Sequence, residues 1–161
     1  MEDKNKNKYL TFSVKNLIDS KERIESYGIP IRKVQEIIGM MEYTPIPKTP
    51  EFIKGVINLR GKIITIIDLR LKLGFKKVAY NDRTCIIIVE VEVENTKKVL
   101  GFVVDIVSEV LDIKAEQIEE FSQEEVGQEK KIIDGIAKIN DKIIMLLDME
   151  KLLTKKEITN S

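Results

Sequence analysis

The chain has 161 residues, enough for one domain or two small lobes, and a chain of this size buries roughly 68–70% of its unfolded surface on folding. Its 27 basic and 27 acidic residues give a formal net charge of zero, which argues against a nucleic-acid binder that works through bulk electrostatics. Histidine is absent and Cys85 is the single cysteine, which removes the commonest general base, a thiolate metal site and an internal disulfide. We therefore expect neither an enzyme nor a protein that needs a cofactor or a metal.

The first third of the chain is predicted to form strands joined by loops. A polar, flexible tail (1–8) precedes an alternating strand (9–14), a charged loop (15–23) and a second strand (24–31). Residues 34–38 are too few to distinguish a helix from a strand. The prolines of 45–50 predict an extended connection, after which Thr49 is expected to cap a very short helix that ends at Gly55.

Residues 55–73 carry the strongest local signal, that of strand, tight turn, strand and short helix. Gly61 supplies the positive φ that a two-residue hairpin turn requires. Asp68 is expected to cap the helix and Gly74 to end it. Arg60 then lies at the hairpin tip, where a long charged side chain is available to a partner.

The second half of the chain repeats this pattern. A loop (76–83), a strand (85–93), a long strand (99–113) and a second hairpin with a helix (132–153) are predicted, followed by a polar, flexible tail (154–161). The stretch 114–131 contains six glutamates and little apolar content, so we expect a mobile loop with a short helix near 116–120. Cys85 begins an apolar run and is interpreted as a buried, inert thiol.

No targeting or membrane-spanning segment is predicted. The start of the chain lacks the apolar core of a signal peptide. The longest apolar run is about six residues, too short to span a bilayer. These signs predict a cytoplasmic protein.

Two ordered repeats indicate a duplicated unit. Residues 55–73 align with 135–153 without gaps, with Asn140-Asp141 in place of Arg60-Gly61. A second set of matches keeps a constant spacing: Gly28, Val34, Glu36, Ile37 and Ile38 correspond to Gly101, Val107, Glu109, Val110 and Leu111. We infer repeat units near 9–74 and 85–153, and we expect the two hairpins to occupy equivalent places. Many short strands with regular turns predict an all-β barrel or sandwich.

Several motifs together resemble one known family. They are Val34-Gln-Glu-Ile37, Ile46-Pro-x-x-Pro50, Gly55-Val-Ile-Asn-Leu-Arg-Gly61, Ile67-Asp-Leu-Arg70 and Gly101-Phe-Val-Val-Asp-x-Val107. Over 9–153 the chain resembles the CheW family, the scaffold proteins of bacterial chemotaxis. Two features depart from that pattern: Thr65 stands where the family usually has Pro, and 15–23 is longer than expected between the first two strands.

The resemblance implies a more specific fold than the pattern alone. It implies an all-β protein of two small five-stranded SH3-like or OB-like β-barrels side by side, with a few short helices. The two lobes would exchange strands within a single CheW-like domain (9–153), so that no clean boundary lies near residue 80.

The resemblance also implies a function. The chain would be a non-enzymatic adaptor that couples membrane chemoreceptors to a CheA-type histidine kinase, without inserting into the membrane, and that is recruited from the cytoplasm to receptor arrays. Receptor-binding positions would be Val34, Glu36, Ile37, Gly101 and Val107. Kinase-binding positions would be Gly55, Asn58, Leu59, Arg60 and Gly61. We further expect Glu36 to lie near Arg60 and to pair with it.

One alternative comes from a different functional class. Small β-barrels also bind single-stranded nucleic acid, through aromatic side chains in a basic groove. Here nine aromatic residues are scattered, tryptophan is absent and the net charge is zero, so this alternative is weaker.

Overall fold

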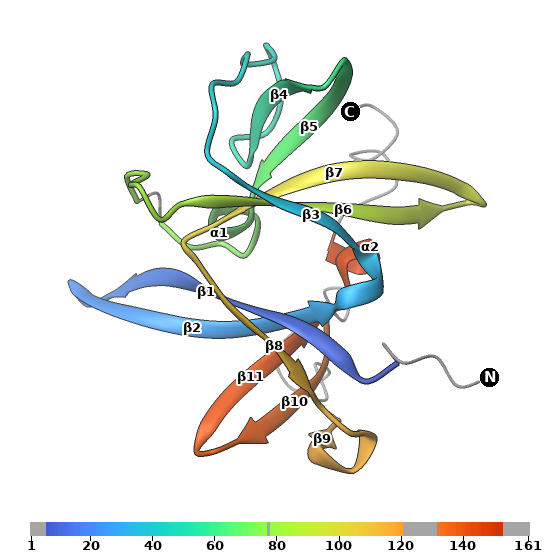
Figure 1. Ribbon diagram of the computed structural model, residues 1–161. Coiled ribbons are helices and arrows are strands. Elements are labelled where there is room, and N and C mark those ends of the chain that lie inside the picture. The colour runs from blue at the N-terminus through green and yellow to red at the C-terminus, as the bar shows by residue number, and fades with distance from the viewer. Residues whose placement is uncertain (1–5, 77, 121–131, 153–161) are drawn as a thin grey trace.

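A computed structural model describes residues 6–76, 78–120 and 132–152, which form two β-sheets with two short helices between them (Figure 1). The elements follow in chain order: β1 (Lys8–Ile18), β2 (Lys21–Pro30), η1 (Ile31–Lys33), β3 (Val34–Gly39), β4 (Ile53–Leu59), β5 (Lys62–Asp68), α1 (Leu69–Lys72), β6 (Cys85–Val93), β7 (Thr96–Val104), β8 (Ile106–Asp112), η2 (Ala115–Gln117), β9 (Ile118–Glu119), β10 (Ile133–Ile139), β11 (Lys142–Leu147) and α2 (Met149–Leu152).

Each sheet contains strands from both halves of the chain. One sheet has the order β8-β1-β2-β11-β10-β9, and the other has the order β3-β6-β7-β5-β4. The first two strands of each repeat thus lie in the sheet that contains the later strands of the other repeat: β1 and β2 lie with β8 to β11, and β6 and β7 lie with β3 to β5. They do so through parallel pairing of β2 with β11 and of β7 with β5. The predicted all-β fold, with two adjacent units and exchanged strands, is confirmed.

The two halves have the same internal geometry, as the duplication predicts. Hairpin β4–β5 corresponds to β10–β11, and both carry a register shift just before the aligned glycine, Gly55 or Gly135. The short strand β9 pairs with β10 where, in the other sheet, Thr44 forms a single bridge to Val56. The hairpin tips at Arg60 and Asn140 therefore occupy equivalent places, which confirms the prediction.

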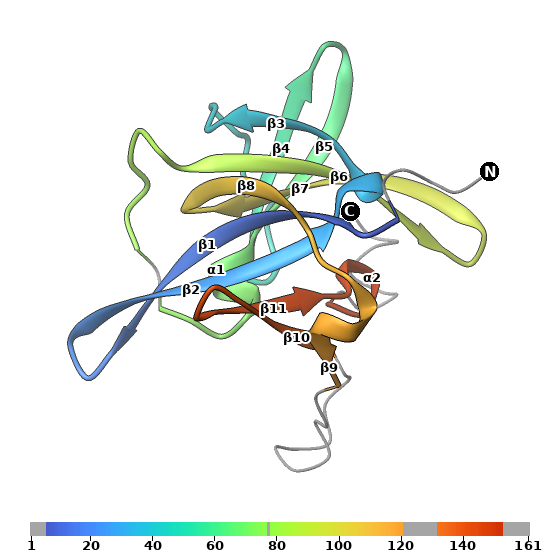
Figure 2. The same ribbon diagram turned by 60° about the horizontal axis from the view of Figure 1, so that its bottom comes forward.

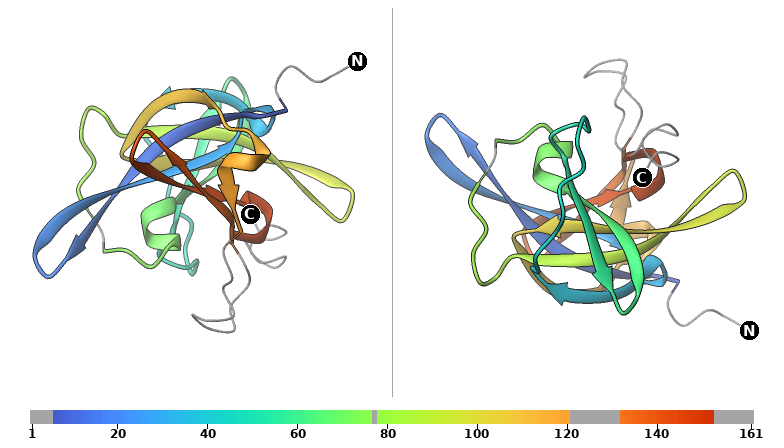
Figure 3. Two further views of the ribbon diagram at one scale, coloured as in Figure 1. Left: turned by 90° about the horizontal axis from the view of Figure 1, so that it is seen from below. Right: turned by 90° about the horizontal axis from the view of Figure 1, so that it is seen from above.

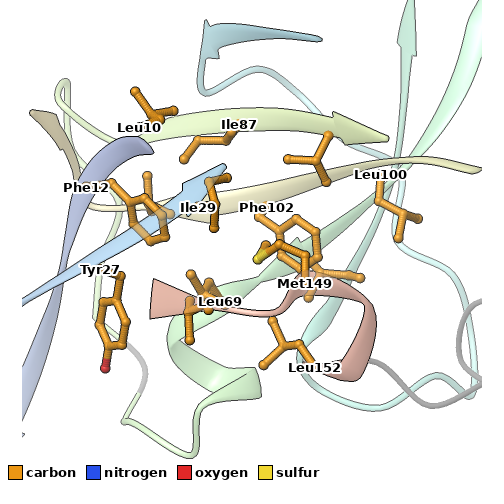
Figure 4. Packing of buried hydrophobic residues seen from close by; sticks show 14 of the residues in the cluster. Leu10, Phe12, Tyr27, Ile29, Leu69, Ile87, Leu100, Phe102, Met149 and Leu152 are labelled. Carbon is orange, nitrogen blue, oxygen red and sulfur yellow. The ribbon is translucent and has the colours of Figure 1, made fainter. Parts of the chain in front are cut away.

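The hydrophobic core has a central part between the sheets and a smaller part within each sheet. In the central part, Leu69 of α1 and Met149 and Leu152 of α2 pack among strand residues such as Phe12 and Phe102 (Figure 4). Strand β6 is buried on both faces, since Ile87 faces the central cluster while Ile86 and Ile88 face the cluster within its own sheet. This explains why the first five residues of β6, from Cys85 to Val89, form an unbroken apolar run, whereas the end of the strand alternates with Glu90 and Glu92.

A buried ionic network lies where the chain passes from one sheet to the other. Arg70 is fully buried and donates from Nη1 to Asp105 at 2.9 Å and from Nη2 to Asp68 at 3.1 Å. Tyr80 donates its hydroxyl to Asp68 at 2.8 Å, and the backbone N–H of Lys15 donates to Asp105 at 2.7 Å. Burial opposes the charge of Arg70, but the hydrogen bonds and charges of the two carboxylates outweigh it and raise its pKa.

Helix α1 begins and ends as the sequence indicates. Asp68 caps it by accepting from the backbone N–H of Arg70, and Gly74 follows with a positive φ of 86°. Because Asp68 also binds the Arg70 side chain, the capping residue is at the same time a member of the buried network.

Three local predictions are wrong. Residues 15–23 are not a loop, since β1 and β2 continue as a paired ribbon to a turn at Asp19-Ser20, which projects from the molecule (Figures 2 and 3). No helix forms over 49–54: Thr49 donates its hydroxyl back to the carbonyl of Ile46, and residues 51–52 form a turn into β4. The strand predicted over 99–113 is broken at Asp105 into β7 and β8, which belong to different sheets.

Two ambiguous segments are resolved. Residues 34–38 belong to a strand, β3, whose pairing with β6 settles what the short sequence left open. Of the acidic stretch, 115–117 form the 3-10 helix η2, while 121–131 lie outside the described residues together with 1–5 and 153–161.

The buried network generates a stability prediction. Arg70→Ala leaves two carboxylates without their buried cation, so we expect a loss of about 3–5 kcal/mol in the free energy of unfolding, measured in urea. Arg60→Ala, which removes an exposed guanidinium, is the control and should unfold close to wild type. A loss at Arg70 no larger than that of the control would contradict the role given to the network.

Candidate functional site

The best candidate for a binding surface lies between strand β3 and the tip of the β4–β5 hairpin. Arg60 at the tip donates from Nη1 to Oε2 of Glu36 at 2.7 Å and from Nη2 to Oε1 at 3.0 Å. The Arg60 side chain is 71% exposed and that of Glu36 is 31% exposed. The predicted pairing of these two residues is therefore confirmed, and the pair is bidentate and open to solvent.

This ion pair connects opposite edges of one sheet. In the order β3-β6-β7-β5-β4, the strand that carries Glu36 and the hairpin that carries Arg60 lie at the two ends. The sheet must curl strongly to bring its edges within hydrogen-bonding distance, and the views from two sides show β3 crossing beside the hairpin (Figures 2 and 3). Tertiary structure thus joins two motifs that are separate in the sequence.

The turn at the hairpin tip has an unusual backbone. Arg60 and Gly61 have φ values of 52° and 86°, so both central residues are left-handed, as in a type I′ turn. Asn58 accepts a hydrogen bond from the Gly61 N–H through its side-chain Oδ1 at 2.9 Å. The predicted kinase-binding residues Asn58, Arg60 and Gly61 therefore form one exposed unit, while Leu59 between them is half-buried.

The predicted receptor-binding residues differ in exposure. Ile37 is 41% exposed on β3, the edge strand of its sheet. Val34 and Val107 are half-buried at equivalent positions of β3 and β8, and both pack against the central core. Exposed apolar surface beside a charged pair suits an amphipathic partner.

Gly55 and Gly101 require a correction, because both are buried and cannot offer contact surface. A Cβ at Gly55 would lie 2.1 Å from the Thr44 carbonyl oxygen, and Gly55 has a φ of 147°. A Cβ at Gly101 would lie 2.8 Å from Ile86. Gly101 and Glu36 pair with the same residue, Ile88 of β6, so Gly101 can shape the surface near Glu36 only through packing.

Other chemistry is limited among the residues that the structure describes. Over these residues there is no group of three or more His, Cys, Asp or Glu that could hold a metal ion. Within the same ranges, no helix is long and apolar enough to cross a membrane. Cys85 is half-buried and not fully buried as predicted; it donates to the Arg83 carbonyl at 3.1 Å, and burial raises the pKa of its thiol, which disfavours the reactive thiolate.

Sequence reasoning missed the network that holds the two sheets in place. Asp68 and Arg70 form a visible motif, and a cap is expected at Asp68, but the second partner of Arg70, Asp105, lies between β7 and β8 in the other repeat. The available signal was an arginine between two leucines at the start of a short helix, two residues after an acid. That pattern indicates a buried ion pair without naming the distant partner.

Comparison with known proteins gives one family. A family model described as the CheW-like domain matches residues 9–157, nearly the whole chain. The chain belongs to the CheW family. A protein of Klebsiella aerogenes named chemotaxis protein CheW is 42% identical over 134 residues, covering 83% of this chain and 78% of the relative. A Helicobacter pylori protein of the same name is 34% identical over 131 residues, covering 81% and 76%.

A solved structure agrees with this result. The crystal structure of the scaffolding protein TtCheW from Thermoanaerobacter tengcongensis matches with a TM-score of 0.75 and 36% identity, covering 94% of this chain and 96% of that chain. The resemblance in the sequence to the CheW family is thereby confirmed.

The fold accounts for one expected departure from the CheW pattern. Thr65 is buried in β5, a strand with neighbours on both sides, and it pairs with Val56 of β4 and Leu100 of β7. Proline at this place would lack the N–H that an interior strand uses in its ladder. Threonine therefore suits the position that it occupies here.

The ion pair predicts a titration behaviour for Glu36. The hydrogen bonds from Arg60 lower the carboxyl pKa, against a weaker opposing effect of desolvation. A lowered pKa in the folded state means that the stabilising effect is present above the unfolded-state pKa and is lost as the pH falls through the folded-state value. An NMR titration should therefore show Glu36 below the usual glutamate pKa, and Arg60→Ala should return it to the usual range. An unchanged titration in Arg60→Ala would contradict the pairing in solution.

Proposed function

We propose that the protein is a non-enzymatic chemotaxis adaptor that couples membrane chemoreceptors to a CheA-type histidine kinase. The observation that carries the proposal is the exposed, bidentate pair of Arg60 and Glu36 within the motifs that resemble those of the CheW family. Relatives named chemotaxis protein and scaffolding protein support the same role. Such an adaptor is recruited from the cytoplasm to receptor arrays and requires no catalytic group.

The receptor-facing part of this surface is β3. Ile37 offers exposed apolar area, Val34 lies half-buried beside the core, and Glu36 supplies a charge whose direction Arg60 fixes. An amphipathic helix of a receptor tip would place apolar side chains against Ile37 and Val34, with polar contacts at Glu36. Val107 occupies the equivalent position to Val34 in the second repeat and could extend the surface.

The kinase-facing part is the hairpin tip from Asn58 to Gly61. A rigid two-residue turn presents Arg60 with two of its five N–H donors bound to Glu36, which leaves the others for an acceptor on the partner. Because Arg60 and Glu36 touch each other, the two binding parts are mechanically linked. A shift at one part is thereby passed to the other, which is how a scaffold without chemistry transmits a signal.

A charge reversal tests the receptor-facing part. Glu36→Lys places a second cation against Arg60 and should weaken binding of a soluble receptor-tip fragment about tenfold or more, measured by calorimetry. The melting temperature should change by only a few degrees, since both side chains are exposed to solvent. Glu116→Lys makes the same change at an exposed position of η2 and should leave the affinity unaltered. Equal affinities for the Glu36 variant and wild type would refute the assignment of β3.

A truncation tests the kinase-facing part. Arg60→Ala removes the exposed guanidinium and should lower the affinity for the kinase regulatory domain severalfold, while the protein remains folded by circular dichroism. Asn140→Ala at the equivalent tip of β10–β11 is the matched control and should bind normally. If both tips can be truncated without loss of kinase or receptor binding, the proposed surface is wrong.

A further inference from the structure

The turn that presents Arg60 is costly for the residue that occupies it. A left-handed φ of 52° is disfavoured for arginine, whose Cβ crowds the backbone, and only Gly, Asn and Asp adopt it readily. The equivalent turn in the second repeat has the same geometry, with φ values of 49° and 66°, and it contains the tolerant pair Asn140-Asp141. The first hairpin therefore needs contacts outside the turn that the second does not.

Asn58 supplies one such contact. Its Oδ1 accepts from the Gly61 N–H at 2.9 Å, so a side chain on β4 is bonded directly to the second residue of the turn. The equivalent position of the second hairpin holds Lys138, which has no acceptor in its side chain. The first hairpin, whose turn contains the unfavourable Arg60, thus has the hydrogen bond to Asn58. The second hairpin, whose turn contains Asn140-Asp141, has Lys138 at that position, which cannot accept one.

Glu36 supplies the other contact. It holds the far end of the Arg60 side chain, while Asn58 holds the backbone on which that side chain begins. The direction of a long arginine side chain depends on the φ and ψ of its own residue, because they set where Cβ points. Loss of the hydrogen bond to Asn58 would let the backbone of the turn change conformation and would move the Cβ of Arg60. The bidentate contact of Arg60 with Glu36, which requires a defined geometry, would then weaken.

We propose that Asn58 is a positioning residue: it holds the left-handed turn so that the guanidinium of Arg60 lies on Glu36 and faces the partner in one direction. Asn58 thus acts through Arg60 and not by touching the partner, although its place in the motif first suggested a direct contact. The effect on partner binding rests on the proposed function. The effect on the pair of Arg60 and Glu36 does not.

The test compares Asn58→Ala, which removes the acceptor, with Asn58→Asp, which keeps it. Lys138→Ala is the matched control in the second hairpin. In Asn58→Ala, exchange of the Gly61 amide hydrogen should become faster by about three- to tenfold, as for loss of one hydrogen bond, and the pKa of Glu36 measured by NMR should move toward its usual value. Asn58→Asp should keep the Gly61 amide protected, and Lys138→Ala should change neither signal.

Binding then separates a positioning role from a direct contact. The probes are a soluble receptor-tip fragment and the kinase regulatory domain, each titrated against the full chain. Asn58→Ala should weaken binding to the partner that Arg60 contacts by about three- to tenfold, and the same substitution should have no further effect in the Arg60→Ala background. Asn58→Asp should bind more tightly than Asn58→Ala.

Three outcomes are decisive. Unchanged Gly61 exchange and Glu36 titration in Asn58→Ala would overturn the proposal, and so would an equal loss of affinity in the Arg60→Ala background, which would make Asn58 a direct contact. If Asn58→Ala alters both NMR signals while even Arg60→Ala leaves binding unchanged, the positioning role of Asn58 is supported and the proposed binding surface fails.

Discussion

A single buried guanidinium fixes how the two sheets meet. Arg70 follows β5 of one sheet, and Asp105 stands where the chain leaves that sheet at β7 and enters the other at β8. The second oxygen of Asp105 binds the backbone of Lys15 in β1, so that three segments of both repeats converge on one fully buried cation. A buried charge is tolerated only when its partners are in place, and this requirement favours one arrangement of the crossing chains.

The second repeat has an ionic contact at the corresponding place, with the charges reversed. Glu150 occupies the position equivalent to Arg70, and Arg32 occupies the position equivalent to Asp105. Glu150 binds Lys33, the neighbour of Arg32. It also accepts from the backbone N–H of Glu92, and its pKa is lowered because these contacts outweigh its partial burial. The ion pair of Lys33 and Glu150 is partly exposed, whereas that of Arg70 and Asp105 is buried, so the two repeats share a fold but differ in the burial of this ionic contact.

This scaffold explains why the candidate surface can be both exposed and well defined. The curl of the β3-β6-β7-β5-β4 sheet brings its two edges together, and the pair of Arg60 and Glu36 spans them in solvent. An ion pair of this exposure adds little to folding by itself, but it holds the guanidinium and the carboxylate in one direction at the surface. The second hairpin has the same backbone but lacks the arginine, which makes the two ends of the pseudo-symmetric molecule chemically different.

The sequence by itself determined what depends on local pattern: the two hairpins, the cap at Asp68, the duplication and the family. The pairing of Glu36 with Arg60 was expected, but its geometry depends on the curl of the sheet that brings β3 to the hairpin. Two sequence predictions were wrong. Residues 15–23 are so rich in charge that they indicate a loop, although β1 and β2 continue through them, and the apolar run around Asp105 indicates one strand, although it forms β7 and β8 in different sheets. Only the tertiary structure decided that Gly55 and Gly101 are buried and that Arg70 reaches Asp105. The physical reason is that hydrogen-bonding propensity and turn geometry are carried by neighbouring residues, whereas burial and ionic partners depend on how distant strands pack.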